Sequence, residues 1–277
     1  MRNSKEILVY ADWQGLKSPE FIGTLFSTFS RGKEIFSFEY DKKWLQSPFV
    51  KAIDPDLGLY SGVQYLRDEK LNFGAWEMIT YELAQAVGLK VEKATAKKFY
   101  GRHHTFLIKR FDRTDAGRRL HFASAMTLLG YTDGVSFQDG ASYLELAEFI
   151  VRRGANINRD LEELFRRIVF SICVSNTDDH LRNHGFLLTN HGWTLSPAYD
   201  INPNPRGVGL KLNISEHDNS LNTDLAMEVA PFFRLTNNRA TDIIKNTAQV
   251  VSNWKKLALK YRIPREEQDR MSAAFRV

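Results

Sequence analysis

Cysteine is nearly absent from this sequence, which contains one among 277 residues. The single thiol, Cys173, excludes an internal disulfide and any metal cluster built from several cysteines. No stretch of about eighteen apolar residues occurs, so we expect no membrane-spanning helix. The first fifteen residues hold only a short apolar run and no small-residue cleavage site, which argues against a secretory signal peptide. Together these absences predict a cytoplasmic protein.

A strong excess of one charge is also lacking. The formal net charge is +5 and the sequence pI is about 9.2. A surplus of this size is typical of a soluble surface, and the alternative is an anionic partner such as a nucleotide, tRNA or DNA. Charge alone does not separate the two, although we expect direct nucleic-acid binding to be absent. Hydrophobic residues make up 43%, enough for one large core or two modest ones.

The front of the chain has the composition of strands and turns. Ile7–Tyr10 and Ile35–Tyr40 are rich in β-branched and aromatic residues, which favours strands. The range 46–62 contains two prolines and two glycines and is predicted to be a connecting loop. Leu89–Ala94 and Thr105–Ile108 are further strand-like runs, separated by a turn at Gly101.

Helical periodicity is strongest in the second half. The range 75–87 is an earlier predicted helix, closed by Gly88. From Ser142 onward the chain turns helical, and with Asn158 as a predicted N-cap one apolar stripe recurs at helical spacing: Leu161, Leu164, Phe165, Ile168 and Ile172. A last long helix is predicted over Ile243–Leu257, ending before Pro264.

A β-rich front and a helical back predict an α+β, two-lobed, protein-kinase-like fold. We divide the chain into a β-rich N-terminal subdomain at 1–62, the remainder of the N-lobe with its hinge at 63–113, and a helical C-lobe at 114–277. An interlobe cleft is where such an architecture places a ligand.

Two neighbouring segments carry the residues suited to chemistry. Asp178 and Asn183 lie five positions apart after the apolar helix, and Asp200 follows a predicted hairpin around 190–192. In protein kinases an Asp and an Asn at this spacing share one loop, and a second Asp follows a hairpin. Phosphoryl transfer needs a carboxylate to orient the attacking hydroxyl and hard oxygen ligands to hold Mg²⁺. The alternative interpretation, on spacing alone, is that these residues cap a helix and form turns.

Two histidines near this motif are four residues apart, which invites a metal-site interpretation. We expect instead that His180 holds the loop together by hydrogen bonding. No H-E-x-x-H pattern accompanies His180 and His184.

The same segments resemble the HipA-like serine/threonine kinases of bacterial toxin–antitoxin systems. The resemblance rests on Asn-Thr-Asp-x-His-x-x-Asn at 176–183 and Leu-Ser-Pro-Ala-Tyr-Asp-Ile at 195–201. The range 106–113 is similar to the family's strand-to-hinge segment, 77–89 to the helix before it, and 7–45 to its small β-rich subdomain. The resemblance therefore covers most of the chain.

Carried over position by position, the resemblance implies a role for each matching residue. Asp178 corresponds to the catalytic carboxylate, and Asn183 and Asp200 to the Mg²⁺ ligands. The backbone of Lys109, Arg110 and Phe111 corresponds to the hinge that contacts the adenine of ATP. Glu77 stands where a glutamate pairs with an ATP-binding lysine.

The family also implies partners. Its members phosphorylate protein serines, including those of aminoacyl-tRNA synthetases, and are often restrained by a DNA-binding antitoxin. The sequence departs from the family before Glu77, because 65–77 contains no Gly-rich phosphate loop and no strand lysine. Either the natural protein has a segment that this chain lacks, which the abrupt join favours, or this is a reduced member with weak or absent catalysis.

Three functions therefore remain open. The leading hypothesis is an ATP- and Mg²⁺-dependent protein kinase. The second is a non-catalytic, kinase-shaped module that binds an antitoxin or a synthetase. The third is a metal-dependent hydrolase that uses Asp178, His180 and Asp200.

Overall fold

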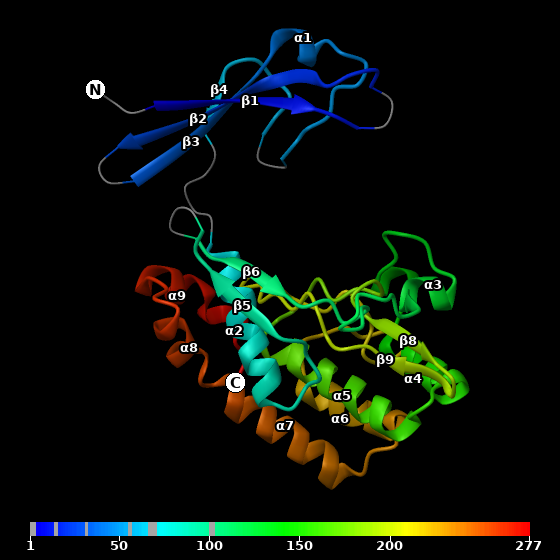
Figure 1. Ribbon diagram of the computed structural model, residues 1–277. Helices are drawn as coiled ribbons and strands as arrows, with labels where there is room; N and C mark the ends of the chain where they lie inside the picture. Colours follow the sequence, from blue (N-terminus) through cyan, green and yellow to red (C-terminus); the bar gives the residue numbers. More distant parts are fainter. Residues whose placement is uncertain (1–3, 14–15, 31–32, 55–56, 66–70, 100–102) are drawn as a thin grey trace. The chain divides into compact units, whose positions relative to one another are not determined.

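Two units divide the chain, Met1–Leu71 and Asn72–Val277 (Figure 1). This computed structural model describes residues 4–13, 16–30, 33–54, 57–65, 71–99 and 103–277. The turn predicted at Gly101 lies outside the described residues. The three-part division at 62/63 and 113/114 stays a prediction.

The first unit is an antiparallel sheet with its own small core. Its strands are β1 (Ser4–Ala11), β2 (Glu20–Ser30), β3 (Lys33–Tyr40) and β4 (Val63–Tyr65), in the spatial order β1-β2-β3-β4. A short helix, α1 (Lys42–Leu45), begins at Asp41, whose carboxylate accepts the backbone N–H groups of Lys43 and Trp44. The buried core contains Ala11, Ile22, Phe38, Tyr40, Trp44 and Leu57. Both strands predicted from β-branched and aromatic composition are confirmed.

The second unit contains two small sheets. Strands β5 (Ala94–Lys97) and β6 (Thr105–Ile108) form an antiparallel pair. Strands β7 (Phe122–Ser124), β8 (Gly185–Thr189) and β9 (Gly192–Leu195) form an antiparallel sheet in that order. The β8–β9 pair is the hairpin that the sequence predicted around 190–192.

Helices are the main regular secondary structure of the second unit. They are α2 (Phe73–Ala86), α3 (Ala125–Leu129), α4 (Tyr143–Arg153), α5 (Ile157–Cys173), α6 (Thr223–Val229), α7 (Asn237–Val251), α8 (Trp254–Lys260) and α9 (Arg265–Met271), with short 3₁₀ turns at Phe137–Asp139, Ala230–Phe233 and Ser272–Ala274. Helix α5 packs against α4, α6 and α7. All five residues of its predicted apolar stripe are buried, which confirms the helix and its face.

A buried carboxylate fixes the second sheet to α5. Asp160, in the first turn of α5, accepts hydrogen bonds from the backbone N–H of Leu195 (2.9 Å) and the hydroxyl of Thr194 (3.0 Å). Arg159 lies 2.9 Å from the same carboxylate. Because β9 is held at its last residues, the chain that follows it starts from a fixed point.

Three predicted boundaries are wrong. The range Leu89–Ala94 makes only an isolated bridge, between Val91 and Ala198, and the strand begins at Ala94. The N-cap of α5 is Asn156. The last predicted helix is two helices, because the side-chain amide of Asn253 donates to the carbonyls of Gln249 and Val250 and so ends α7.

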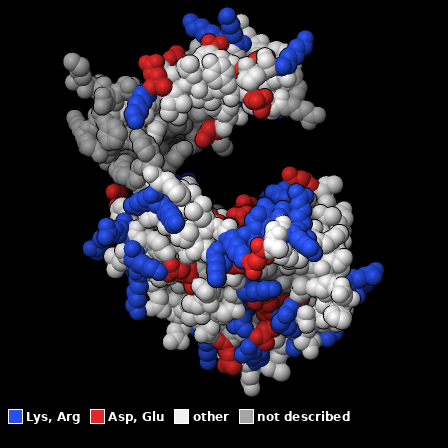
Figure 2. All heavy atoms as spheres, in the orientation of Figure 1, with Lys and Arg blue, Asp and Glu red and all other residues white. Residues whose placement is uncertain are grey.

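Charge is divided unevenly between the two units. Met1–Leu71 contains ten Lys or Arg and ten Asp or Glu, so the net charge of +5 belongs to Asn72–Val277. Figure 2 shows a cluster of Lys and Arg side chains on the face of the second unit that is in view. Among the described residues, no helix combines the length and the apolar composition that crossing a membrane requires.

Candidate active site

The predicted catalytic loop leaves the end of α5 through a strained residue. Ser175 has a left-handed backbone (φ 49°) and is completely buried. Arg276, near the last residue of the chain, donates from its guanidinium to the Ser175 hydroxyl (3.0 Å) and from its backbone N–H to the carbonyl of Cys173 (2.8 Å). The loop is thus fixed at its first residue by a distant part of the sequence.

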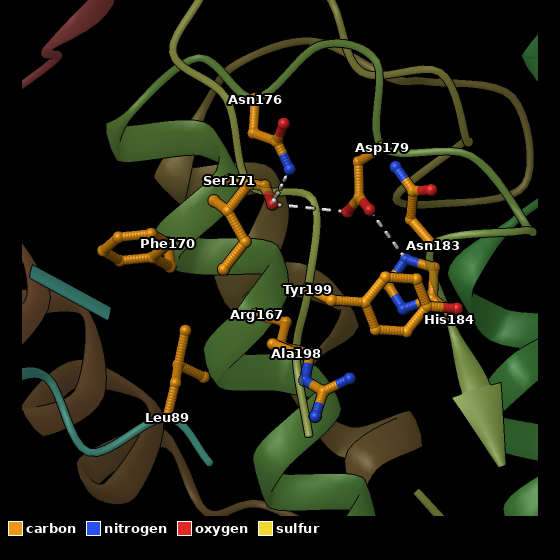
Figure 3. A pocket seen from close by; sticks show the side chains of 11 residues that line it. Leu89, Arg167, Phe170, Ser171, Asn176, Asp179, Asn183, His184, Ala198 and Tyr199 are labelled. Carbon is orange, nitrogen blue, oxygen red and sulfur yellow. Dashed lines mark hydrogen bonds and ion pairs between the residues drawn. The ribbon is translucent and has the colours of Figure 1, made fainter. Parts of the chain in front are cut away.

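Two adjacent aspartates on this loop have opposite surroundings. The side chain of Asp178 is exposed, whereas Asp179 is 4% exposed. The Asp179 carboxylate accepts hydrogen bonds from the hydroxyls of Tyr143 on α4 (2.6 Å) and Ser171 on α5 (3.3 Å). Its other oxygen lies 3.0 Å from His184, an ion-pair distance without hydrogen-bond alignment (Figure 3).

The electrostatics of this cluster favour an ionised Asp179. Burial alone raises the pKa of a carboxyl group, but the electrostatic interaction with His184 and the hydrogen bonds from Tyr143 and Ser171 together lower the pKa of Asp179 below its usual value. Burial raises the pKa of Tyr143 well above its usual value, and the neighbouring Asp179 carboxylate raises it further. Asp179 therefore ties the loop to two helices.

Asn183 is positioned to offer an oxygen. It is 7% exposed, and its side-chain NH₂ donates to the backbone carbonyl of Asp178 (3.2 Å). That bond assigns the nitrogen of the amide and leaves the carbonyl oxygen as an acceptor. The backbone N–H of Asn183 donates to the carbonyl of His180 (2.8 Å), which closes the loop.

The segment that carries Asp200 is held by α2. Thr80 donates to the carbonyl of Ile201 (2.6 Å) and Tyr81 to the carbonyl of Ala198 (3.0 Å). The backbone N–H of Ala198 donates to the carbonyl of Lys90 (2.7 Å). Asp200 itself is exposed in a left-handed conformation (φ 57°), which costs a non-glycine residue energy and persists only where the surroundings enforce it.

Hydrogen bonds join this segment directly to the catalytic loop. The Asn176 side-chain oxygen accepts the backbone N–H of Asn202 (3.2 Å), and Asn204 donates from its side chain to Thr177 (2.7 Å). The Tyr199 hydroxyl donates to the carbonyl of Arg182 (2.5 Å). Both segments line one cavity of about 20 Å³, which has room for roughly one water molecule (Figure 3).

Glu77 lies within electrostatic reach of Asp200. Burial, and then the charge of Asp200, raise the pKa of Glu77 to about 7. No Lys or Arg among the described residues forms an ion pair with Glu77. The predicted lysine partner thus has no counterpart in the part of the chain that the structure describes.

The three predicted hinge residues follow β6. The backbone N–H of Lys109 donates to the carbonyl of Lys93 (2.9 Å). The side chain of Lys109 pairs with Asp115 (2.8 Å), and that of Arg110 with Asp112 (2.7 Å). The side chains of Lys109 and Arg110 are 53% and 69% exposed and are engaged in these ion pairs, whereas the predicted hinge role concerns the backbone.

The third hinge residue connects this stretch to the site. The ring of Phe111 packs against Tyr199 and Phe122, with centroids 5.4 and 5.6 Å apart. Tyr199 directly precedes Asp200 in the sequence. The hinge stretch and the Asp200 segment are therefore in contact.

His180 is half-buried and contributes a backbone carbonyl to the loop. Its ring nitrogen Nε2 lies 3.0 Å from Arg182, which also pairs with Asp133. The role predicted for its side chain stays a prediction. No group of three His, Cys, Asp or Glu side chains able to hold a metal ion occurs within the described ranges.

Sequence reasoning missed the buried polar residues under the site. Arg167 on α5 is 4% exposed, and its guanidinium donates to the carbonyl of Ser196 (2.5 Å) and to Glu163 (3.0 Å). One of its terminal nitrogens, Nη1, has no hydrogen-bond partner among the described residues. The sequence signal for a buried Arg167 was its position three residues after Leu164, on the apolar side of α5.

These features define a class of protein. An α+β unit with an Asp and an Asn on one loop, a hairpin, and a second Asp on a segment that a preceding helix holds has the organisation of a protein kinase. The chain belongs to the HipA-like C-terminal domain family, whose model matches residues 50–254. The recognition made from the two sequence motifs is confirmed.

Curated relatives support this assignment. The chain is 28% identical over 135 residues to a protein of Haemophilus influenzae named "Putative kinase", covering 45% of this chain and 39% of that protein. It is 24% identical over 143 residues to the serine/threonine-protein kinase toxin HipA of Shewanella oneidensis, covering 45% of this chain and 33% of that protein. The matched part thus spans less than half the length of either relative.

A solved structure shows the same fold. The chain matches HipA in the complex of Shewanella oneidensis HipA, HipB and operator DNA with a TM-score of 0.60 and 16% identity, covering 98% of this chain and 61% of that one. The α+β, protein-kinase-like fold predicted from the sequence is confirmed.

Proposed function

We propose that this protein is an ATP- and Mg²⁺-dependent serine/threonine protein kinase of the HipA-like toxin type. The observation that carries the proposal is the direct hydrogen bonding between the loop of Asp178 and Asn183 and the segment of Asp200. Three oxygen-bearing side chains lie on two neighbouring segments that one set of hydrogen bonds holds together.

The donor chemistry of the site fits a magnesium ion. Mg²⁺ prefers oxygen ligands and is commonly bound by one or two carboxylates together with substrate phosphates and water. The free carbonyl oxygen of Asn183 and the exposed carboxylate of Asp200 supply such ligands. When bound, the ion neutralises charge on the phosphate oxygens.

Asp178 is the proposed catalytic carboxylate. It accepts the proton of a serine or threonine hydroxyl as that oxygen bonds to the γ-phosphorus of ATP. The bond from the γ-phosphorus to the bridging oxygen breaks, and ADP leaves with the electron pair. Exposure of Asp178 beside buried Asp179 fits this role, because one turn presents the first carboxylate and anchors the second.

Nucleotide binding is assigned to the hinge backbone. Because the N–H of Lys109 already bonds to Lys93, adenine recognition falls to the backbone of Arg110 and Phe111. Glu77 is the proposed partner of an ATP-binding lysine. Proposed partners of the whole protein are a protein substrate, such as an aminoacyl-tRNA synthetase, and a DNA-binding antitoxin, by analogy with the complex of HipA and HipB.

A non-catalytic binding module is the second candidate. It is favoured by the sequence from Tyr65 to Glu77, which contains no Gly-rich phosphate loop. The absence of an ion pair between Glu77 and any described Lys or Arg also favours it. A module of this kind keeps the kinase fold and acts by holding its partner.

Calorimetry with Mg·ATP separates the two candidates. For the kinase we expect Mg·ATP to bind with a Kd in the micromolar range. Asp200→Asn removes the charge of one proposed Mg²⁺ ligand, and we expect it to weaken this affinity at least about tenfold, which corresponds to about 1.4 kcal/mol. The matched control is Asp242→Asn, an exposed aspartate on α7. Wild-type protein that binds no Mg·ATP rejects the kinase in favour of the module.

A further inference from the structure

Positive charge is concentrated in one short stretch of the second unit. The 30 residues from Lys90 to Arg119 contain ten Lys or Arg and three Asp or Glu, a net charge of +7. Since the whole chain carries +5, the remainder is slightly acidic. Figure 2 shows a cluster of basic side chains on the face of the second unit that is in view, in the region where β6 leads toward α3 in Figure 1.

A hydrogen-bonded turn presents much of this charge. After β6 the chain folds back on itself over residues 109–120, which we name the basic hairpin. Leu120 donates to the carbonyl of Asp112 (3.0 Å) and Thr114 to that of Arg118 (2.9 Å). Gly117 closes the turn with a left-handed φ of 76°. The cations on it are therefore held on a defined backbone.

Ion pairs within the basic hairpin engage three of its five cations. Asp112 pairs with Arg110 (2.7 Å) and Arg113 (2.6 Å). Lys109 takes the second acidic residue of the hairpin, Asp115. Arg118 and Arg119 are the two remaining cations of the hairpin.

Arg118 and Arg119 are exposed and form no ion pair with any residue that the structure describes. With five cations and two carboxylates, the hairpin keeps a net charge of +3. Exposed apolar side chains accompany these cations: Leu107, Ile108, Leu120 and Phe122, each 37–40% exposed. The surface therefore offers both charge and apolar area.

The basic hairpin adjoins the candidate active site. Phe111, its third residue, packs against Tyr199, the neighbour of Asp200. A polypeptide that places a hydroxyl group at Asp178 thus has this surface within reach of its flanking residues. The hairpin side chains are not needed for the phosphoryl transfer step.

We propose that the basic hairpin docks an acidic segment of the protein whose hydroxyl group is phosphorylated. This inference rests on the proposed function and names its substrate class. Cations without partners attract carboxylates and bring the acceptor to the site, an effect that sets specificity and association rate more than affinity. The apolar side chains contact the stem of the same segment.

An acidic protein segment fits better than a nucleic acid. The carboxylates of Asp178 and Asp200 supply negative charge on the two segments next to the hairpin, and this charge repels a continuous phosphate backbone that extends across both. A peptide escapes this repulsion, because its acidic residues lie on one side of a neutral serine. Attraction between opposite charges therefore favours the acidic peptide, and repulsion between like charges disfavours the nucleic acid.

Binding and transfer are measured separately to test this. The probes are a serine peptide flanked by Glu and Asp, the same peptide with Gln and Asn, and a single-stranded oligonucleotide of matching charge. The variant is Arg118→Gln with Arg119→Gln, which alters neither a proposed ligand nor the catalytic carboxylate. The control, Lys245→Gln with Lys256→Gln, makes the same charge change on α7 and α8 at exposed positions.

We expect the acidic peptide to bind more tightly than the neutral one, and salt to weaken its binding. The hairpin variant should lower this affinity about five- to tenfold at low ionic strength, the combined effect of two exposed charge pairs, and the control should not. Equal affinity for both peptides, or tighter binding of the oligonucleotide, overturns the proposal.

Transfer distinguishes failure of the docking surface from failure of the kinase. Phosphorylation of both peptides with equal efficiency overturns the docking surface and keeps the kinase. A second outcome is that the acidic peptide binds in a salt-dependent way, that the hairpin variant loses this binding, and that no peptide is phosphorylated. This result keeps the docking surface and rejects the kinase.

Discussion

At the scale of single residues, Asp178 and Asp179 divide two tasks between adjacent positions. The side chain of Asp178 is exposed, whereas Asp179 is buried against Tyr143, Ser171 and His184. A carboxylate with several buried partners is costly to move, so it fixes its neighbour. The spacing to Asn183 selects Asp178 in the sequence, and the packed structure adds that Asp179 is the buried residue of the two.

Removing the charge of Asp179 tests this division. We predict that Asp179→Asn lowers the free energy of unfolding by about 3–5 kcal/mol, because it removes the charge of the buried carboxylate that Tyr143, Ser171 and His184 contact. Urea denaturation measures the change. Asp178→Asn, the matched control on the same turn, should alter stability by less than about 0.5 kcal/mol. Equal losses in the two variants contradict the account.

Glu77 gives a prediction in pH. Its pKa is raised from 4.5 to about 7 by burial and by Asp200, so the folded protein binds this proton more tightly than the unfolded chain. Linkage then requires stability to fall as pH rises between these two values. Glu77→Gln removes this dependence and should raise the melting temperature relative to wild type above about pH 7, and not near pH 4.5.

The measurement is thermal unfolding in protein stripped of divalent ions. Glu228→Gln, at an exposed position on α6, is the control and should show the wild-type pH dependence. If Glu77→Gln changes the melting temperature by the same amount near pH 4.5 and above about pH 7, the prediction is wrong.

At the scale of elements, α2 holds the segment that carries Asp200. Tyr81→Phe removes the hydroxyl that donates to the carbonyl of Ala198. A buried carbonyl without its donor costs about 1–3 kcal/mol, and the loosened segment should bind Mg²⁺ less tightly. Urea denaturation and a Mg²⁺ titration measure the two effects.

Tyr261→Phe is the control for this prediction. Tyr261 donates its hydroxyl to Glu82, also on α2 but not part of the link to Asp200. We expect a loss of stability without a change in Mg²⁺ affinity. If both variants change the affinity equally, α2 does not act through its bond to Ala198.

The elements differ in how far the sequence predicted them. Helix α5 and the β8–β9 hairpin follow from local pattern, since an apolar stripe and a short turn need no distant information. The range 89–94 failed as a strand because its partners are single residues elsewhere, Ala198 and Lys109. The break between α7 and α8 depends on one side chain, Asn253, folding back on the helix.

The candidate site shows the same limit. Asp178, Asn183 and Asp200 were identified by spacing and by a family motif, and their catalytic and ligand roles stay predictions. Arg167 and Tyr143 carry no motif, because their importance comes from contacts across the fold. Buried polar partners of this kind become visible only when distant elements are brought together.

At the scale of the whole molecule, the proposed chemistry belongs to one unit. The first unit has its own core and no net charge, while Asn72–Val277 carries all proposed catalytic and ligand residues and the basic hairpin. Family membership, fold and site organisation agree on a kinase-like protein. Phosphoryl transfer is the step on which the proposed function depends.

Transfer of labelled γ-phosphate from Mg·ATP to protein is the most direct test of that step. We predict measurable incorporation by the wild-type protein and a loss of about 10²–10⁴-fold in Asp178→Asn, the contribution of a positioned general base. Circular dichroism should show both proteins equally folded. Incorporation that is unchanged in Asp178→Asn would contradict the account.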